Sequence, residues 1–92
     1  MKRAARFIVK GTVQGIFFRQ FVKEHADKLG IVGYVRNLTA GDVEIFAESE
    51  KENIERLAEI VKKGPEHAQI RHVQIKERKV SDQFKNFQIL KF

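Results

Sequence analysis

One stretch of residues with helical spacing limits most strongly what this chain can fold into. The stripe consists of Phe18, Phe21, Val22, His25, Ala26 and Leu29. These residues recur at i, i+3, i+4, i+7, i+8 and i+11, the spacing of one face of an α-helix. Gly30 follows, and glycine is typical of the position just after a helix C-terminus. The pattern predicts a helix with one apolar face, which another layer of structure must cover.

Segments with strand patterns stand on both sides of this helix. The expected strands cover residues 6–10, 31–37, 43–48, 70–77 and 87–92. Val43, Ile45 and Ala47 show the alternation of a strand with one buried face. The turn sequence Thr39-Ala40-Gly41-Asp42 joins the second and third strands, so these two form a hairpin.

A second helix is predicted after the third strand. Its apolar face consists of Ile54, Leu57, Ala58 and Val61. Ser49 with Glu52 three residues later has the pattern of a capping box, so we expect the helix to be capped by the Ser49 side chain. Lys62 and Lys63 followed by Gly64-Pro65 are typical of a helix C-terminus.

The order of these elements predicts an α+β fold. The order β-α-β-β-α-β is the split β-α-β, or ferredoxin-like, plan: an antiparallel sheet with two helices on one face. The segment 87–92 adds a C-terminal strand. With 92 residues and no linker, the chain is expected to form a single domain over residues 1–92. We expect this domain to be a monomer.

Composition excludes several kinds of chemistry. The chain has no cysteine, which excludes disulfides, thiolate metal sites and cysteine nucleophiles. No segment approaches the roughly 20 apolar residues of a membrane span or has the pattern of a signal peptide, so we expect a cytoplasmic protein with no membrane partner. The net charge of +6 favours an anionic partner and fits nucleic acid, an anionic membrane or a small phosphorylated ligand equally well.

The segment from Gly11 to Gly15, between the first strand and the first helix, has the features of an anion-binding loop. Glycines let successive backbone N–H groups face one point, and the helix N-terminus adds partial positive charge. In a right-handed β-α-β unit, the end of the first strand, the start of the helix and the end of the second strand lie together. This topology brings Arg19 and Asn37 to the loop. Glycine is also common at strand-to-helix turns for purely structural reasons, so a structural role for Gly11 and Gly15 stays open.

Arg19 and Asn37 are the candidate functional side chains. A cation in the first helical turn opposes the helix dipole by roughly 0.3–1 kcal/mol. That penalty is offset if the guanidinium pairs with a bound dianion. The Asn37 amide has the chemistry to hold a water in line with an electrophile. The alternatives are a solvated arginine and an asparagine that only caps a strand end.

Other catalytic and metal-binding patterns do not occur in the sequence. No GK[ST] follows the glycine loop, and there is no G-x-G-x-x-G motif or nucleophile elbow. His25, His67 and His72 are too widely spaced for a metal-ligand pattern, and His25 is expected to pack on the helical stripe. The aspartates are isolated, and the glutamates are expected largely at solvent-facing positions. We therefore expect neither a metal nor another cofactor.

Three motifs, in this order, resemble the acylphosphatase family. They are Gly11-Thr12-Val13-Gln14-Gly15-Ile16-Phe17-Phe18-Arg19, Gly33-Tyr34-Val35-Arg36-Asn37 and Gly41-Asp42-Val43-Glu44. The resemblance covers nearly the whole chain and includes Gly64-Pro65 and the closing aromatic strand. Tyr34 stands where the family often has tryptophan, and Ala40 where aspartate is frequent. Neither departure touches the chemistry that the resemblance implies.

The resemblance implies a hydrolase that cleaves the carboxyl-phosphate bond of small acylphosphates, giving a carboxylate and inorganic phosphate without a metal ion or a covalent intermediate. It implies that the phosphate-binding loop consists of Gly11, Thr12, Val13, Gln14, Gly15, Ile16 and Phe17. It also implies that Arg19 binds the phosphate and that Asn37 positions the attacking water. The base in such a reaction is the substrate's own phosphate oxygen.

The residues leave two non-enzymatic functions open. Nucleic-acid-binding sheets share this element order, and the protein is basic. However, no strand has their K/R-G-F/Y-G/A-F pattern, and Phe17, Phe18 and Phe21 belong to the loop and helix, so we expect no nucleic-acid partner. The second alternative is an anion sensor that has the loop but lacks turnover.

Overall fold

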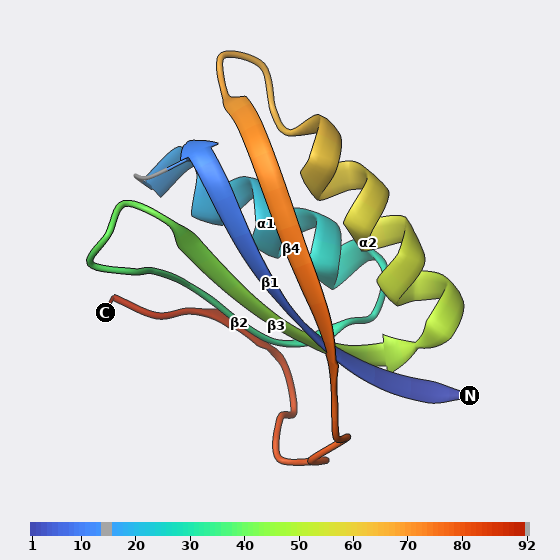
Figure 1. Ribbon diagram of the computed structural model, residues 1–92. Helices are drawn as coiled ribbons and strands as arrows, with labels where there is room; N and C mark the ends of the chain where they lie inside the picture. Colours follow the sequence, from blue (N-terminus) through green and yellow to red (C-terminus); the bar gives the residue numbers. More distant parts are fainter. Residues whose placement is uncertain (14–15, 92) are drawn as a thin grey trace.

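The structure is a computed structural model that describes residues 1–13 and 16–91 (Figure 1). Its elements are β1 (Lys2–Thr12), α1 (Ile16–Lys28), β2 (Val32–Asn37), β3 (Val43–Glu50), α2 (Lys51–Lys63), β4 (Gln69–Arg78) and β5 (Phe87–Ile89). The predicted order of helices and strands is confirmed. β1 is longer than predicted because residues 2–5 also pair with β3, from Lys2 opposite Glu50 onward.

The strands form one sheet with the order β4-β1-β3-β2-β5, and both helices lie on one of its faces (Figure 1). The ferredoxin-like α+β fold is confirmed. The four strands β4, β1, β3 and β2 form the predicted antiparallel sheet, and the predicted extra C-terminal strand, β5, pairs parallel to β2. β4 and β5 lie at opposite edges of the sheet, and the connection between them stays at the end of the sheet where β4 finishes (Figure 1). β5 therefore starts at that end and runs opposite to β4, which makes it parallel to β2.

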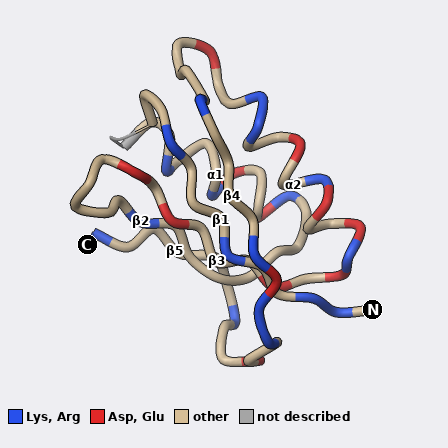
Figure 2. The backbone as a smooth tube through the Cα atoms, in the orientation of Figure 1, with Lys and Arg blue, Asp and Glu red and all other residues tan. Residues whose placement is uncertain are grey.

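The core lies between the sheet and the helices. The sheet contributes buried side chains such as Phe7, Val9, Val35, Val43 and Ile45, and the helices contribute Phe18, Val22, Ala26, Ile54, Leu57 and Val61. The apolar faces predicted for both helices are thus confirmed. His25 packs edge-on against Phe21, with ring centroids 4.7 Å apart. The outer side of α2 carries alternating basic and acidic residues, typical of a solvated surface (Figure 2).

The start of α2 differs from the prediction. The N-cap is Glu50, and it makes no side-chain capping hydrogen bond. Ser49 is still part of β3, where it lies opposite Arg3. Its Oγ accepts a hydrogen bond from Asn53 Nδ2 at 3.0 Å and donates one to Gly30 O at 3.4 Å. The capping-box prediction is wrong because Ser49 pairs with Arg3 as part of β3. The helix therefore begins after Glu50, one residue later than the capping box requires.

The carboxylate of Glu48 holds the β4–β5 connection against the sheet face that the helices leave open. Glu48 is 1% exposed. It accepts hydrogen bonds from Ser81 N at 2.7 Å, Ser81 Oγ at 2.8 Å and Asp82 N at 3.3 Å. The expectation that glutamates face solvent is wrong for Glu48 and for Glu44, because each carboxylate finds donors inside the protein that compensate its burial.

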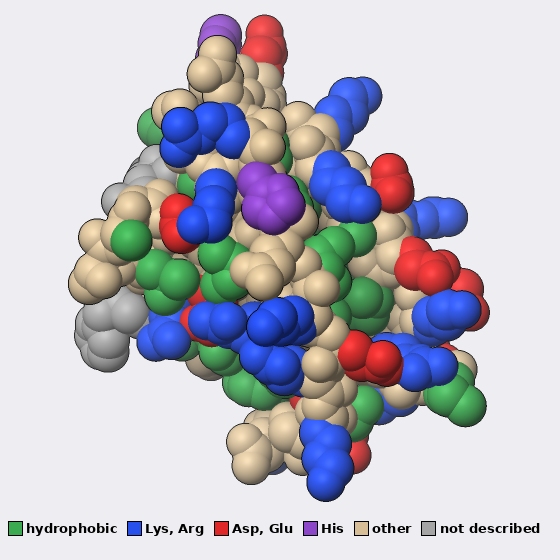
Figure 3. Space-filling view, in the orientation of Figure 1, with side chains coloured by type: hydrophobic (Ala, Val, Ile, Leu, Met, Phe, Trp, Pro, Cys, Tyr) green, Lys and Arg blue, Asp and Glu red, His purple; other side chains and the backbone are tan. Residues whose placement is uncertain are grey.

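Glu44 lies on the same face between two arginines, where Figure 3 shows Lys and Arg side chains gathered over the sheet. Its side chain is 4% exposed, and it accepts hydrogen bonds from Arg6 Nε and Arg36 Nε. Burial alone raises the pKa of this carboxyl, but the hydrogen bonds and charges of Arg6 and Arg36 outweigh burial and leave the pKa below its ordinary value. The ionised form is therefore favoured by folding.

We expect Glu44 to make stability depend on pH. A carboxyl whose pKa is lower in the folded protein stabilises the fold fully above its unfolded-state pKa and loses that contribution as the pH falls through the folded-state pKa. Glu44→Gln should lower the free energy of unfolding by about 2 kcal/mol at pH 7, since two hydrogen bonds to a charged group are weakened. Denaturant unfolding from pH 7 to pH 3 should show the difference between wild type and variant shrinking in acid. A constant difference over this range would contradict the assignment.

Candidate active site

A backbone irregularity at Gly11 ends the regular part of β1. The register between β1 and β4 shifts between Lys10 and Gly11. Gly11 has φ +141°, and a Cβ at this position would lie 1.9 Å from the Gln69 carbonyl oxygen. Only glycine fits this conformation and this close approach of backbone. The chain can therefore leave the sheet here, at the end where β1 and β2 finish and β4 begins, which we call the loop end.

The predicted phosphate loop, residues 11–17, is divided among three environments. Gly11 and Thr12 belong to β1, and Val13 is 1% exposed and anchors the chain in the core. Gln14 and Gly15 lie outside the described residues. Ile16 and Phe17 open α1, whose first turn contains no acidic residue. The partial positive charge of this helix N-terminus is thus not opposed by a carboxylate from its own first turn.

Asn37 is the last residue of β2 and belongs to a row of side chains facing the helices. It lies opposite Val43, which in turn lies opposite Val9 of β1. Val9 and Val43 are fully buried on the helix side, and directly opposite residues point to the same face. With strands about 4.8 Å apart, Asn37 is about 10 Å from β1 along this row. Its side chain therefore lies on the face that carries α1, at the loop end.

The side-chain oxygen of Asn37 is unusual. Oδ1 is buried and accepts no hydrogen bond from the residues that the structure describes. A buried acceptor without a donor costs about 1–3 kcal/mol, and such groups are few in native proteins. An asparagine that served only to cap the strand would use this oxygen for a backbone N–H. Oδ1 instead has the capacity to accept a hydrogen bond from a ligand or a water.

Arg19 is tied to the same end of the sheet through the chain that follows β5. Its Nη1 donates a hydrogen bond to Leu90 O at 3.4 Å, and Leu90 N donates to Val35 O at 2.9 Å. Val35 precedes Asn37 by two residues on β2. The fold thus brings the guanidinium and the Asn37 amide to the loop end, from segments that are 18 positions apart in the sequence.

The end of β5 shows how Arg19 is held. The predicted final strand, residues 87–92, is reduced to Phe87–Ile89, and Phe92 lies outside the described residues. The last described bond of this ladder is the one from Leu90 N. The Leu90 carbonyl turns to the Arg19 side chain instead of to a neighbouring strand. The sequence contains no signal for this backbone acceptor, because the contact joins residues 71 positions apart.

The open face of the sheet carries aromatic residues that sequence reasoning missed. The rings of Tyr34 and Phe46, on neighbouring strands, are stacked with centroids 5.8 Å apart. Their alternation with buried residues of β2 and β3 was the signal that could have found them. Phe84 packs against both rings, at 5.9 and 5.5 Å. The aromatic groups that a nucleic-acid-binding sheet would offer for stacking are therefore already engaged within the protein.

The histidines and carboxylates form no cluster in the described part of the chain. Within residues 1–13 and 16–91, no three His, Asp or Glu side chains gather as a set of metal ligands. His67 is exposed and has φ +73°, and its nearest acidic neighbour is Glu66, with Nε2 and Oε1 3.9 Å apart.

No helix within the same ranges is long and apolar enough to cross a membrane.

The element order and sheet topology place this chain among ferredoxin-like α+β proteins. Comparisons with known proteins show which family of that fold it belongs to. A family model described as acylphosphatase matches residues 5–89. A curated acylphosphatase of Alkalilimnicola ehrlichii is 44% identical over 75 residues, covering 82% of this chain and 84% of the relative. One of Helicobacter hepaticus is 35% identical over 99% of this chain and 100% of the relative. The crystal structure of acylphosphatase from Bacillus subtilis superimposes with a TM-score of 0.91 at 34% identity, covering 98% of this chain and 99% of that one.

The chain therefore belongs to the acylphosphatase family. It is an enzyme of that class, a hydrolase of acyl phosphates. The resemblance carried by the three sequence motifs is confirmed at this level.

Proposed function

We propose that this enzyme cleaves the carboxyl-phosphate bond of small acylphosphates at the loop end, without a metal ion, using residues 11–17, Arg19 and Asn37. One observation carries the proposal. Asn37 Oδ1 is a buried acceptor without a donor among the described residues, and it lies at the same end of the sheet as Arg19. A water or substrate group that donates to this oxygen would remove the penalty of its burial.

The phosphate is bound by main-chain and side-chain donors together. Backbone N–H groups of residues 11–17, with Gln14 and Gly15 included by the resemblance, surround the phosphate oxygens at the start of α1. The Arg19 guanidinium supplies two parallel N–H donors to the dianion. The Leu90 carbonyl accepts a hydrogen bond from Nη1 and so restricts the orientation of the guanidinium. These donors stabilise the charge that builds up on the phosphoryl oxygens in the transition state.

Asn37 positions the nucleophile. Its Oδ1 accepts a hydrogen bond from a water whose oxygen then attacks the phosphorus in line with the bond to the carboxyl oxygen. The new P–O bond forms as the old one breaks, and the acyl group leaves as a carboxylate with the bonding electron pair. The water's proton passes to a phosphate oxygen of the substrate, so the products are a carboxylate and inorganic phosphate. A carboxylate is a good leaving group, and this pathway needs no protein base.

A direct assay tests the proposed function. Purified protein should release phosphate from benzoyl phosphate at the same rate with and without an excess of chelator, and it should leave nucleoside triphosphates intact. Inorganic phosphate should inhibit competitively, because the product occupies the same donors. A rate that disappears with chelator and returns with a divalent cation would contradict the metal-free mechanism. Phosphate binding without any hydrolysis would identify an anion sensor instead.

A further inference from the structure

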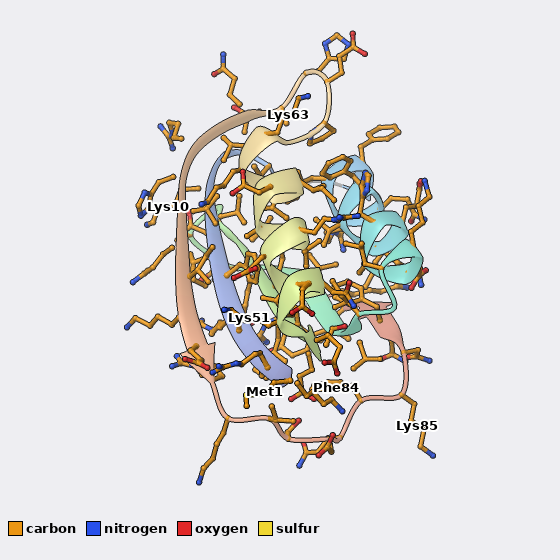
Figure 4. The ribbon with its side chains drawn as sticks, turned by 90° about the vertical axis from the view of Figure 1, so that its right-hand side faces the viewer. Met1, Lys10, Lys51, Lys63, Phe84 and Lys85 are labelled. Atoms are coloured by element: carbon orange, nitrogen blue, oxygen red, sulfur yellow. The ribbon has the colours of Figure 1, made fainter. Side chains whose placement is uncertain are left out.

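A hollow lies beside the loop end and has no role in the mechanism described above. It has a volume of about 560 Å³. Its lining residues are Thr12, Phe17, Phe18, Pro65, Glu66, His67 and Ala68. It is bounded by the first turn of α1 and by the turn between α2 and β4, which lie at the same end of the molecule (Figures 1 and 4). The hollow therefore adjoins the segment proposed to bind the phosphate.

The wall of this hollow includes apolar surface that the described residues leave exposed. Phe17 is 87% exposed, although it is a large aromatic residue in the first turn of a helix. Its neighbour Phe18 is 3% exposed and packs in the core, so Phe18 stabilises the fold whereas the Phe17 ring faces solvent. Ala68 is packed against the core on the opposite wall, next to Pro65 in the same turn. An apolar group that entered the hollow would bury surface on both walls, which is favourable by about 25 cal/mol per Å².

The position of the hollow relative to Asn37 fits the geometry of the reaction. In the sheet order, β1 separates β4 from β3 and β2. Asn37 lies on the β2 side of β1, whereas the hollow lies on the β4 side, because residues 65–68 lead directly into β4 and Gln69 pairs with Thr12. An in-line displacement needs the attacking water and the leaving group on opposite sides of the phosphorus. If the water is on the Asn37 side, the leaving acyl group points toward the hollow.

We propose that this hollow is the acyl-group subsite and that it selects aromatic and other bulky apolar acyl groups, with Phe17 as the residue that sets the selectivity. The inference depends on the proposed function for the placement of the phosphate, and it adds the class of substrate. Acyl groups as small as acetyl reach little of the apolar wall. A benzoyl group is large enough to contact the Phe17 ring and the opposite wall.

The test compares two substrates in wild type and Phe17→Ala. We expect the ratio of kcat/KM for benzoyl phosphate to that for acetyl phosphate to fall about tenfold in the variant, within the range that apolar contacts contribute to selectivity. Any loss common to both substrates cancels in this ratio, which separates acyl recognition from phosphate binding. Phe17→Leu should give an intermediate ratio. Ile75→Ala is the matched control, because Ile75 is also an exposed apolar residue but lies on β4 outside the hollow, and its ratio should equal that of wild type.

A binding measurement separates this inference from the proposed function. Calorimetry should show that benzylphosphonate binds wild type more tightly than methylphosphonate and that Phe17→Ala removes most of the difference. If wild type hydrolyses neither acylphosphate but shows this preference, the proposed function fails and the subsite stands. If wild type hydrolyses both and Phe17→Ala leaves the kcat/KM ratio and the binding preference unchanged, the subsite is overturned while the proposed function stands. Equal binding of the two phosphonates by wild type would also overturn the subsite.

Discussion

Arg19→Ala should lower kcat/KM for benzoyl phosphate by at least about 10²-fold, because it removes a charged donor from the phosphoryl group in the transition state. The same variant should weaken inhibition by inorganic phosphate. Arg19→Lys should recover only part of the activity, since an ammonium keeps the charge but lacks the planar pair of donors that matches two phosphate oxygens. Steady-state kinetics with phosphate as inhibitor measure both effects.

Lys28→Ala is the matched control for this experiment. Lys28 lies at the other end of α1, is exposed, and its replacement changes the net charge by the same amount. It should leave kcat/KM within about twofold of wild type, because exposed charges farther away than about 10 Å are largely screened at ordinary ionic strength. Thermal unfolding of Arg19→Ala checks that loss of the hydrogen bond to Leu90 O leaves the fold intact. A folded Arg19→Ala protein with near wild-type turnover would refute the role proposed for Arg19.

Asn37→Ala should lower kcat by at least about 10²-fold and change the inhibition constant of inorganic phosphate by less than about threefold. The reason for the difference is that water placement and anion binding use separate groups, and a misplaced nucleophile by itself costs about this much in rate. The thermal midpoint should change little, since Oδ1 accepts no hydrogen bond from the described residues and its removal breaks none there. Kinetics, phosphate inhibition and thermal unfolding on the same preparation give the three readouts.

Thr39→Ala serves as the control for position 37. Thr39 is exposed in the turn between β2 and β3, two residues beyond Asn37, and it is outside the proposed site. Its replacement should affect none of the three readouts strongly. If Asn37→Ala instead lowers the midpoint by several degrees with kcat preserved, Asn37 is a structural cap and the proposed placement of water is wrong. A large loss of phosphate binding with normal kcat would mean that Asn37 acts on the anion.

Short sequence patterns correctly predicted the helices and strands of the fold and their order. The spacing of Phe18, Val22 and Ala26 predicted α1 and its buried face because the helix places neighbours in sequence on the same side. The alternation in residues 43–47 predicted the inner face of β3 for the same kind of reason. The capping box at Ser49 failed, although it is also a local pattern, because pairing with Arg3 extends β3 over it. A contact between residues 46 positions apart outweighed the local preference.

Charges were harder to place from the sequence. Glu44 and Glu48 alternate with apolar residues as solvent-facing glutamates do, yet both are buried. Their partners come from β1, β2 and the β4–β5 connection. A carboxylate is buried only where donors surround it, and those donors are known only when the strands and the connection have been placed together.

The sequence by itself determined the element order and the buried faces of both helices. It also singled out the glycine segment before α1 and the candidates Arg19 and Asn37. All of these follow from residue types and from spacings of a few residues. Only the tertiary structure decided that the last strand runs parallel to β2, that Leu90 O accepts from Arg19, that Asn37 Oδ1 is buried without a described donor, and that a hollow opens beside Phe17. These features depend on pairings between residues far apart in the chain, and such pairings are selected by the packing of the whole sheet and its helices, not by any local preference.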